Sequence, residues 1–280
     1  MPDRLDVRDA PLRSPGQRPD HRVVAVALAL LLAVGAVLAA CGSDDDDSSP
    51  SGGSALTGDL TVFAAASLTE AFEDAQKTLE SSDPDLNLTY SFAGSQDLVQ
   101  QIRDGAPADV FASADEKNMQ KLVDDGLVEK PEVFARNTLA IAVEPGNPKD
   151  IKGLDDLSRS DVTVVLADPS VPVGRYSQQV LGKAGVTVKP ASLELDVKAT
   201  LAKVTSGEAD AAIVYRTDVE SSGGKADAVD IPDDQNVIAT YPIAVVKASG
   251  HKAAARAYVD EIVSGSGQDA LKAKGFLPPS

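Results

Sequence analysis

The feature of this sequence that most restricts its fold is a strand–turn–helix unit over residues 60–79. It opens with the β-favouring residues Leu60, Val62 and Phe63, passes through three alanines, and continues with apolar residues at helical spacing. Ser67, followed three residues later by Glu70, has the form of a capping box and predicts a helix N-cap at Ser67. Because a helix N-terminus suits an anion, Ser67 is a candidate ligand; the alternative is a plain helix cap.

A second unit of the same kind follows over residues 86–102. An alternating strand over 86–92 leads into the turn Ala93-Gly94-Ser95, and Leu98, Val99 and Ile102 mark the next helix. Ser95 is again predicted at an N-cap. In open α/β sheets, ligands bind outside the carboxyl ends of the strands, so we expect both serines to face one crevice.

The rest of the chain continues this alternation and predicts an α/β fold with largely parallel sheets. Asp109 and Asp115 are interpreted as a strand-edge residue and a helix N-cap, and not as a catalytic carboxylate pair. Strong strands at 137–143 and 241–246 enclose a second α/β set, with strands at 162–167 and 210–215 and helices at 175–183 and 196–205. We therefore predict two lobes joined by two crossing strands, lobe I being residues 59–138 and 240–280 and lobe II residues 139–239.

The N-terminus has the pattern of an exported lipoprotein. Residues 1–22 carry five arginines, and residues 23–40 are apolar and uncharged, which is typical of a secretory signal; a transmembrane helix is the alternative. Leu38-Ala39-Ala40-Cys41-Gly42 resembles a bacterial lipobox, so residues 1–40 are predicted to be removed and Cys41 to be lipidated. The lipid would anchor the protein to the membrane outside the cytoplasm. Residues 41–58, with the run Asp44–Asp47, are predicted to be a flexible acidic tether.

Composition and missing motifs exclude several functions. The formal net charge of −17 argues against nucleic-acid binding but not against a small-anion ligand. A single cysteine excludes a disulfide framework within the chain. No nucleophile elbow, zinc-protease motif or phosphate loop is present, and His251 has no metal partner at ligand spacing. We therefore expect neither an enzyme nor a cofactor.

Six segments, in order along residues 60–277, resemble the periplasmic molybdate-binding proteins of ABC transporters. They are residues 62–68, 91–95, 105–115, 171–176, 196–198 and 213–218, and the ending Lys274-Gly275-Phe276 fits as well. The resemblance implies a two-lobed periplasmic binding protein fold of type II that binds molybdate or tungstate in its cleft. It also implies a monomer that delivers the ligand to a membrane permease.

The resemblance implies a set of ligand-binding residues. Ser67 and Ser95 would supply hydroxyls and backbone N–H groups, Val173 and Val197 backbone N–H groups, and Tyr215 its phenol O–H. These groups would contact the oxygens of molybdate and not the metal itself. Val173 stands where one kind of relative has Ala, and Gly94 stands where some relatives have Ser, so one hydroxyl found in those relatives is absent.

The chemistry of these groups fits a fully ionised oxyanion. Molybdate is a tetrahedral dianion without a proton, so its site needs only donors. Sulfate is also fully ionised, and a receptor for another oxyanion such as sulfate on the same fold remains the alternative. Arg175, Lys198 and Arg216 lie near the proposed residues in sequence. They either pair with the ligand or lie on the surface or bridge the lobes. We favour the second interpretation, because the serine, tyrosine and backbone donors suffice for the ligand.

Overall fold

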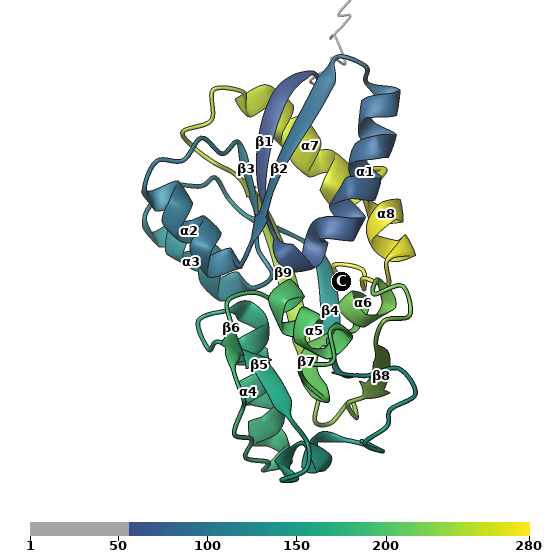
Figure 1. Cartoon of the computed structure of the whole chain (residues 1–280). Coiled ribbons are helices and arrows are strands. Elements are labelled where there is room, and N and C mark those ends of the chain that lie inside the picture. Colours follow the sequence, from purple (N-terminus) through teal and green to yellow (C-terminus); the bar gives the residue numbers. More distant parts are fainter. Residues whose placement is uncertain (1–55) are drawn as a thin grey trace, which may run out of the picture. The chain divides into compact units, whose positions relative to one another are not determined.

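Nine strands form one mixed sheet in the computed structural model, which describes residues 56–280 (Figure 1). The order is β2-β1-β3-β9-β4-β7-β5-β6, and β8 pairs with β4. The strands are β1 (Gly58–Ala65), β2 (Leu86–Ala93), β3 (Val110–Ala112), β4 (Glu132–Val143), β5 (Val164–Ala167), β6 (Leu193–Glu194), β7 (Ala211–Tyr215), β8 (Asp227–Asp230) and β9 (Ile238–Val245). The predicted signal peptide, the lipidated Cys41 and nearly all of the tether lie outside the described residues.

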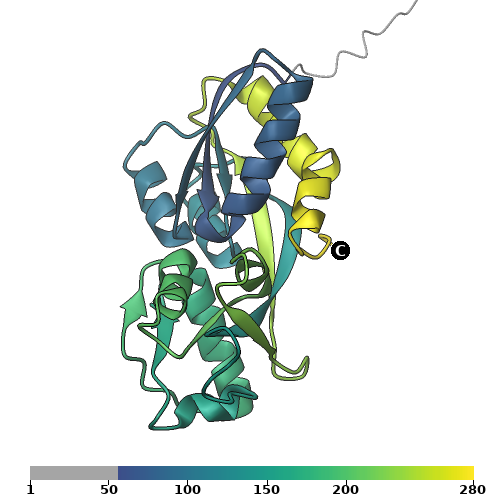
Figure 2. The ribbon, with the colours of Figure 1, turned by 45° about the vertical axis from the view of Figure 1, so that its right-hand side comes forward.

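Two long strands connect the two halves of the sheet. Residues 132–138 of β4 pair with β9, whereas residues 139–143 pair with β7 and β8. β9 in turn pairs with β3, so β4 and β9 run through both halves (Figures 1 and 2). The prediction of two lobes joined by two crossing strands is confirmed.

The predicted strand direction is correct only for the outer strands. β1 is parallel to β2 and β3, and β5 is parallel to β6 and β7. β4 and β9 are antiparallel to each other and to their other neighbours. The expectation of largely parallel sheets is therefore wrong in the middle, where the chain passes between the halves without an intervening crossover helix.

In the first half, helices cover both faces of the sheet. α2 (Ser95–Arg103) and α3 (Glu116–Asp124) pack on one face, where Phe63 and Phe111 meet Leu98 and Leu122. α1 (Thr69–Ser82), α7 (Lys252–Ser264) and α8 (Gly267–Ala273) lie on the other face (Figure 1). Val62 and Phe63 belong to different cores because successive side chains of a strand point to opposite faces.

The second half contains α4 (Pro172–Ala184), α5 (Val197–Thr205) and α6 (Arg216–Glu220). Val180 of α4 and Leu201 of α5 share one apolar core with Ile213 of β7. Two short 3-10 helices, η1 (Ala66–Leu68) and η2 (Leu154–Ser158), complete the elements. None of the helices within residues 56–280 is long and apolar enough to span a membrane.

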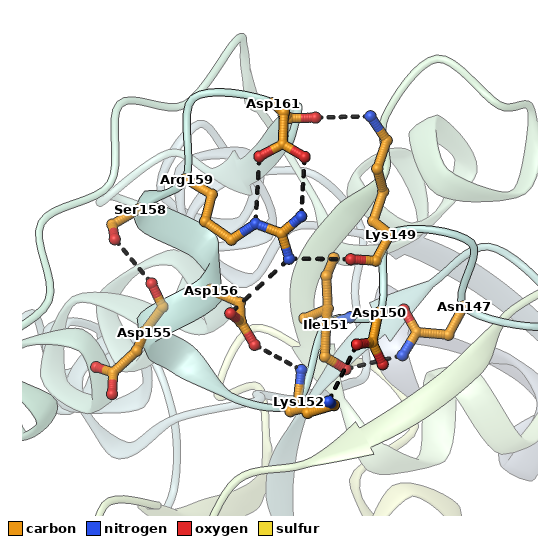
Figure 3. Close-up of polar contacts among 10 residues, drawn as sticks. All are labelled: Asn147, Lys149, Asp150, Ile151, Lys152, Asp155, Asp156, Ser158, Arg159 and Asp161. Carbon is orange, nitrogen blue, oxygen red and sulfur yellow. Dashed lines mark hydrogen bonds and ion pairs between the residues drawn. The ribbon is translucent and has the colours of Figure 1, made fainter.

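The long connection from β4 to β5 is held by its own polar contacts (Figure 3). The Arg159 guanidinium donates to both carboxylate oxygens of Asp161, at 3.2 and 2.8 Å, and to the Lys149 carbonyl at 2.9 Å. Lys149 Nζ donates back to the Asp161 carbonyl at 2.6 Å. These contacts replace regular secondary structure in satisfying the polar groups of the loop.

Candidate ligand-binding site

A cavity of about 210 Å³ lies where strand ends and helix N-termini of both halves meet. The cavity is small and has room only for a small ligand. All five ligand residues predicted from the sequence line it. The lining consists of Ala65, Ala66, Ser67, Ala93, Gly94, Ser95, Ala114, Val171, Pro172, Val173, Asp196, Val197 and Tyr215.

Ser67 lies in the 3-10 helix η1 and is 4% exposed. Its Oγ is 3.1 Å from Tyr241 Oη and makes no capping hydrogen bond. The predicted N-cap and capping box are wrong, because the 3-10 turn delays the start of α1 until Thr69. Glu70 binds Lys198 from the other half and not the backbone of the turn. The Ser67 side chain thus connects the turn after β1 to β9.

Ser95 is the first residue of α2 and is 1% exposed. The N-cap position belongs to Gly94, so the predicted cap at Ser95 is also wrong. The Ser95 Oγ instead accepts a hydrogen bond from the Ala114 N–H at 3.1 Å, which ties the turn after β2 to the turn after β3. Asp115, by contrast, caps α3 as predicted by accepting from the Asn118 N–H at 2.8 Å.

Val173 and Val197 stand in the first turns of α4 and α5. Within residues 56–280 their backbone N–H groups have no hydrogen-bond acceptor, as expected at a helix N-terminus. Gly174 allows α4 to begin close to β5, since a Cβ there would collide with the backbone oxygens of Ala167 and Asp168. Asp196 lines the cavity as well, and its Oδ1 accepts from the Ala199 N–H at 2.8 Å as the cap of α5.

Tyr215 ends β7 and is 1% exposed. Its hydroxyl makes no hydrogen bond of ordinary length among the described residues, although the Tyr241 hydroxyl is close enough to contribute to its raised pKa. Burial raises the pKa of Tyr215 well above the usual value, so the phenol keeps its proton at neutral pH. The ring packs edge-on against Tyr241, with the centroids 5.7 Å apart. Tyr215 therefore places a protonated O–H group, with no short hydrogen bond of its own, at the cavity.

The three basic side chains near the cavity form ion pairs within the protein. Arg175 of α4 pairs with Asp115 of the first half. Lys198 of α5 lies 2.7 Å from Glu70 Oε2 and 3.1 Å from Asp218 Oδ1. Arg216 pairs with Asp230, both in the second half. None of the three side chains lines the cavity. Their contacts therefore fit the prediction that they lie on the surface or bridge the lobes, and not the alternative that they pair with the ligand.

The cavity thus combines hydroxyl donors with helix N-termini, contains no lysine or arginine, and has Asp196 as its one charged side chain. Such a lining can hold a small anion by hydrogen bonds to ionised oxygens. Among the described residues, no group of three or more His, Cys, Asp or Glu side chains is placed to hold a metal ion. Tyr241 contacts Ser67 but does not line the cavity. It was not predicted from the sequence, because a tyrosine in a buried strand carries no local signal of a contact with a distant serine.

Comparison with known proteins identifies the family of this chain and the fold that it shares with solved structures. The family described as bacterial extracellular solute-binding protein matches residues 60–277, and the chain belongs to it. These are solute-binding proteins and not enzymes, in agreement with the expectation from the sequence.

Three of the matching proteins are named for oxyanion binding. The chain is 39% identical over 243 residues to the Molybdate-binding protein ModA of Mycobacterium tuberculosis, covering 86% of this chain and 93% of the relative. The periplasmic molybdate-binding protein of Azotobacter vinelandii matches with a TM-score of 0.70 at 21% identity, over 79% of this chain and 100% of the other. The sulfate-binding protein SubI of Mycobacterium tuberculosis matches with a TM-score of 0.69 at 22% identity, over 79% and 86%. The two structures establish the two-lobed periplasmic binding protein fold.

Proposed function

We propose that this protein captures molybdate outside the cytoplasm and delivers it to an ABC transporter permease. The observation that carries the proposal is the lining of one small cavity by Ser67, Ser95, Val173, Val197 and Tyr215. The name of the 39%-identical relative, which covers most of both chains, supports molybdate as the ligand. We extend the proposal to tungstate, which is also a tetrahedral dianion.

The donors of the cavity suit this ligand. Ser67, Ser95 and Tyr215 contribute O–H groups, and the first turns of α4 and α5 contribute backbone N–H groups. Each hydrogen bond to an ionised oxygen contributes about 1.5–3 kcal/mol net. A site without a buried cation avoids the desolvation of a second charge. We propose that the ligand oxygens, and not the metal, contact all five residues.

Sulfate is the second candidate, because the sulfate-binding protein SubI shares the fold. Sulfate and molybdate have the same charge and shape and differ in size. The site must therefore discriminate between them by how well each tetrahedral anion fills the cavity. The two structural matches do not discriminate between the candidates. In sequence, the chain is 39% identical to a relative named for molybdate and 25% identical to the Sulfate-binding protein of Synechococcus elongatus, which favours molybdate.

We propose lobe boundaries at 59–138 and 240–280 for lobe I and at 139–239 for lobe II, with closure around the ligand. Contacts that cross these boundaries support closure. Gln96 Nε2 donates to the Leu195 carbonyl at 2.9 Å, Lys198 binds Glu70, and Arg175 pairs with Asp115. Hinge closure of two lobes around a ligand is common in periplasmic binding proteins. The closed form would be the one that the permease recognises.

We propose that the mature protein begins at a lipidated Cys41 and acts as a monomer on the outer side of the membrane. The lipobox-like segment 38–42 supports the anchor. The acidic segment 41–58 would serve as a hydrated tether between the lipid and β1. Replacement of Cys41 by Ser should release the protein from membranes, and continued membrane association of that variant would contradict the anchor.

Thermal unfolding with added oxyanions tests the ligand. A ligand that binds only the folded state at a hundred times its Kd stabilises it by about 2.7 kcal/mol. We expect molybdate and tungstate to raise the melting temperature strongly, and sulfate and hydrogen phosphate to leave it nearly unchanged. An equal rise with sulfate would favour the second candidate. The absence of a rise with any oxyanion would contradict oxyanion capture altogether.

A further inference from the structure

Tyr241 is a fully buried tyrosine of β9 that lies behind the cavity and does not line it. Its Oη is 3.1 Å from Ser67 Oγ, although the two residues are 174 positions apart in the chain. Its ring is held edge-on by three aromatic rings, at centroid distances of 6.2 Å to Phe134, 5.7 Å to Tyr215 and 5.5 Å to Phe276. The hydroxyl is therefore fixed in position against Ser67.

Ser95, the other serine of the cavity, shows how a hydrogen bond received from a neighbouring group orients a serine hydroxyl. A serine hydroxyl has one proton to donate and two lone pairs that accept. The Ala114 N–H donates to Ser95 Oγ at 3.1 Å, so this hydrogen bond uses a lone pair and leaves the Ser95 proton available to the cavity. The direction of this bond is certain, because a backbone N–H can only donate.

We propose that Tyr241 does the same for Ser67: its phenol donates to Ser67 Oγ and thereby directs the Ser67 O–H toward the cavity. This inference rests on the proposed function, because the oriented proton has a role only if the cavity binds an anion. Tyr241 is then a positioning residue that does not touch the ligand.

The properties of the two hydroxyls support this direction. Burial raises the pKa of Tyr241 well above its usual value, so the phenol retains its proton at neutral pH. A phenol is a stronger acid than an aliphatic hydroxyl and is the better donor of the pair. If Ser67 instead donated to Tyr241, its proton would point away from the cavity, and Ser67 would present only lone pairs to an anion.

The consequence is selectivity against protonated oxyanions. With Tyr241 and Ala114 donating from behind, Ser67 and Ser95 face the cavity as donors, and Tyr215 adds a third O–H. Hydrogen phosphate carries a proton that needs an acceptor, whereas these three hydroxyls direct their hydrogens at the ligand. Asp196, the one carboxylate in the lining, already accepts from the Ala199 N–H. A binding site rejects a competing ligand strongly when their polar groups clash or when a polar group is left without a hydrogen-bond partner.

The variant Tyr241→Phe removes the hydroxyl and keeps the ring. Tyr258→Phe is the matched control, because Tyr258 is also fully buried and its Oη also lies 3.1 Å from a hydroxyl, that of Tyr90, in the core. We expect Tyr241→Phe to raise the Kd for molybdate about tenfold, the loss of roughly one well-placed hydrogen bond. The hydrogen phosphate Kd should not rise, because the Ser67 hydroxyl is then free to turn a lone pair toward the ligand. The ratio of the hydrogen phosphate Kd to the molybdate Kd should therefore fall at least tenfold. Tyr258→Phe should change neither value.

Calorimetric titrations of the purified full chain with molybdate and with phosphate, at pH 8, measure both values. The ratio of the two constants remains meaningful if a variant is partly unfolded, because loss of folded protein affects both titrations equally. In a Ser67→Ala background, Tyr241→Phe should have no further effect on either constant, since the residue acts through Ser67.

The outcomes separate this inference from the proposed function. A wild-type protein that does not bind molybdate would overturn both. A wild-type protein that binds molybdate, together with an unchanged Kd and an unchanged ratio for Tyr241→Phe, would overturn the role of Tyr241 alone. Full additivity of Tyr241→Phe with Ser67→Ala would also overturn it.

Discussion

At the scale of single residues, the cavity wall uses two kinds of donor. Ser67, Ser95 and Tyr215 bring hydroxyls, whereas Val173 and Val197 bring only backbone N–H groups. The side chains of the two valines are buried in the core, so their identity matters less than their position at a helix N-terminus. Substitutions that remove a hydroxyl, or that move a helix end, should therefore affect binding most.

Replacement of Ser95 by Ala should weaken molybdate binding at least tenfold. The change removes one O–H donor and leaves the buried Ala114 N–H without its acceptor, which also costs about 1–3 kcal/mol of folding stability. Ser249→Ala is the control, because Ser249 Oγ also makes a buried hydrogen bond, to Asp109 Oδ1, away from the cavity. Calorimetry that gave the same Kd for wild type and Ser95→Ala would remove Ser95 from the site.

Replacement of Gly174 by Ala should lower both the melting temperature and the affinity. The added Cβ collides with the backbone oxygens of Ala167 and Asp168, so the N-terminus of α4 must move away from β5 and carry the Val173 N–H with it. We expect at least a tenfold weaker Kd for molybdate, from a displaced charge-assisted hydrogen bond.

Gly182→Ala in the same helix is the matched control for Gly174→Ala. A Cβ at Gly182 meets nothing within 4 Å, and alanine favours the helix by up to about 1 kcal/mol over glycine. Its melting temperature should be equal or higher, with an unchanged Kd. Similar behaviour of the two variants in thermal unfolding and calorimetry would contradict the packing role of Gly174.

At the scale of elements, the turns after the strands bring the site together. η1 and the first turns of α2, α4 and α5 all contribute to the lining, and β7 ends in it at Tyr215. α5 and α1 are connected across the halves by Lys198, which binds Glu70 of α1 and Asp218 of α6. This ion cluster lies beside the turn that carries Ser67, so it couples the position of α1 to the second half.

The buried Asp218 should make folding stability depend on pH. Burial raises its pKa from 3.8 to about 6, although Lys198 acts in the opposite direction. Between these values the folded protein holds the proton more tightly than the unfolded chain does, so stability falls as the pH rises through this window and levels off above it. Asp218→Asn, which cannot ionise, should lack this decrease.

Denaturant unfolding of wild type and Asp218→Asn at pH 4, 5, 6 and 7 measures the effect. Titrating groups away from the cluster around Lys198 are common to both proteins and cancel in the comparison. We expect the wild type to lose roughly 3 kcal/mol of unfolding free energy relative to Asp218→Asn across the window. Parallel curves for the two proteins would show that Asp218 keeps an ordinary pKa in the folded state.

Local sequence patterns predicted a helix cap or a strand correctly where the contacts that form it lie between residues close in sequence. The Asp115 cap depends on Asn118, three residues away, and was predicted correctly. The caps at Ser67 and Ser95 were wrong, because their hydroxyls bond to Tyr241 and Ala114, which are distant in sequence. The two-residue β6 and the five-residue α6 are too short for a periodic pattern to reveal. The resemblance to a family, and not periodicity, brought Val173, Val197 and Tyr215 into one predicted site.

At the scale of the whole molecule, an acidic protein with a net charge of −17 is proposed to bind a dianion. The general field of such a protein opposes the ligand, so local dipoles must provide the attraction. The cavity provides them from both halves of the sheet, which are connected by β4 and β9 (Figure 2). A ligand that bonds to both halves should favour the arrangement in which they meet.

The central claim, that the cavity is a selective molybdate site, is tested most directly by competition titration of the purified protein with molybdate, tungstate and sulfate. We predict that molybdate and tungstate displace each other at comparable concentrations and that a hundredfold excess of sulfate displaces neither. The variants Ser67→Ala and Tyr215→Phe should each weaken molybdate binding about tenfold, by the loss of one donor. Displacement of molybdate by equimolar sulfate, or unchanged binding in both variants, would contradict the claim.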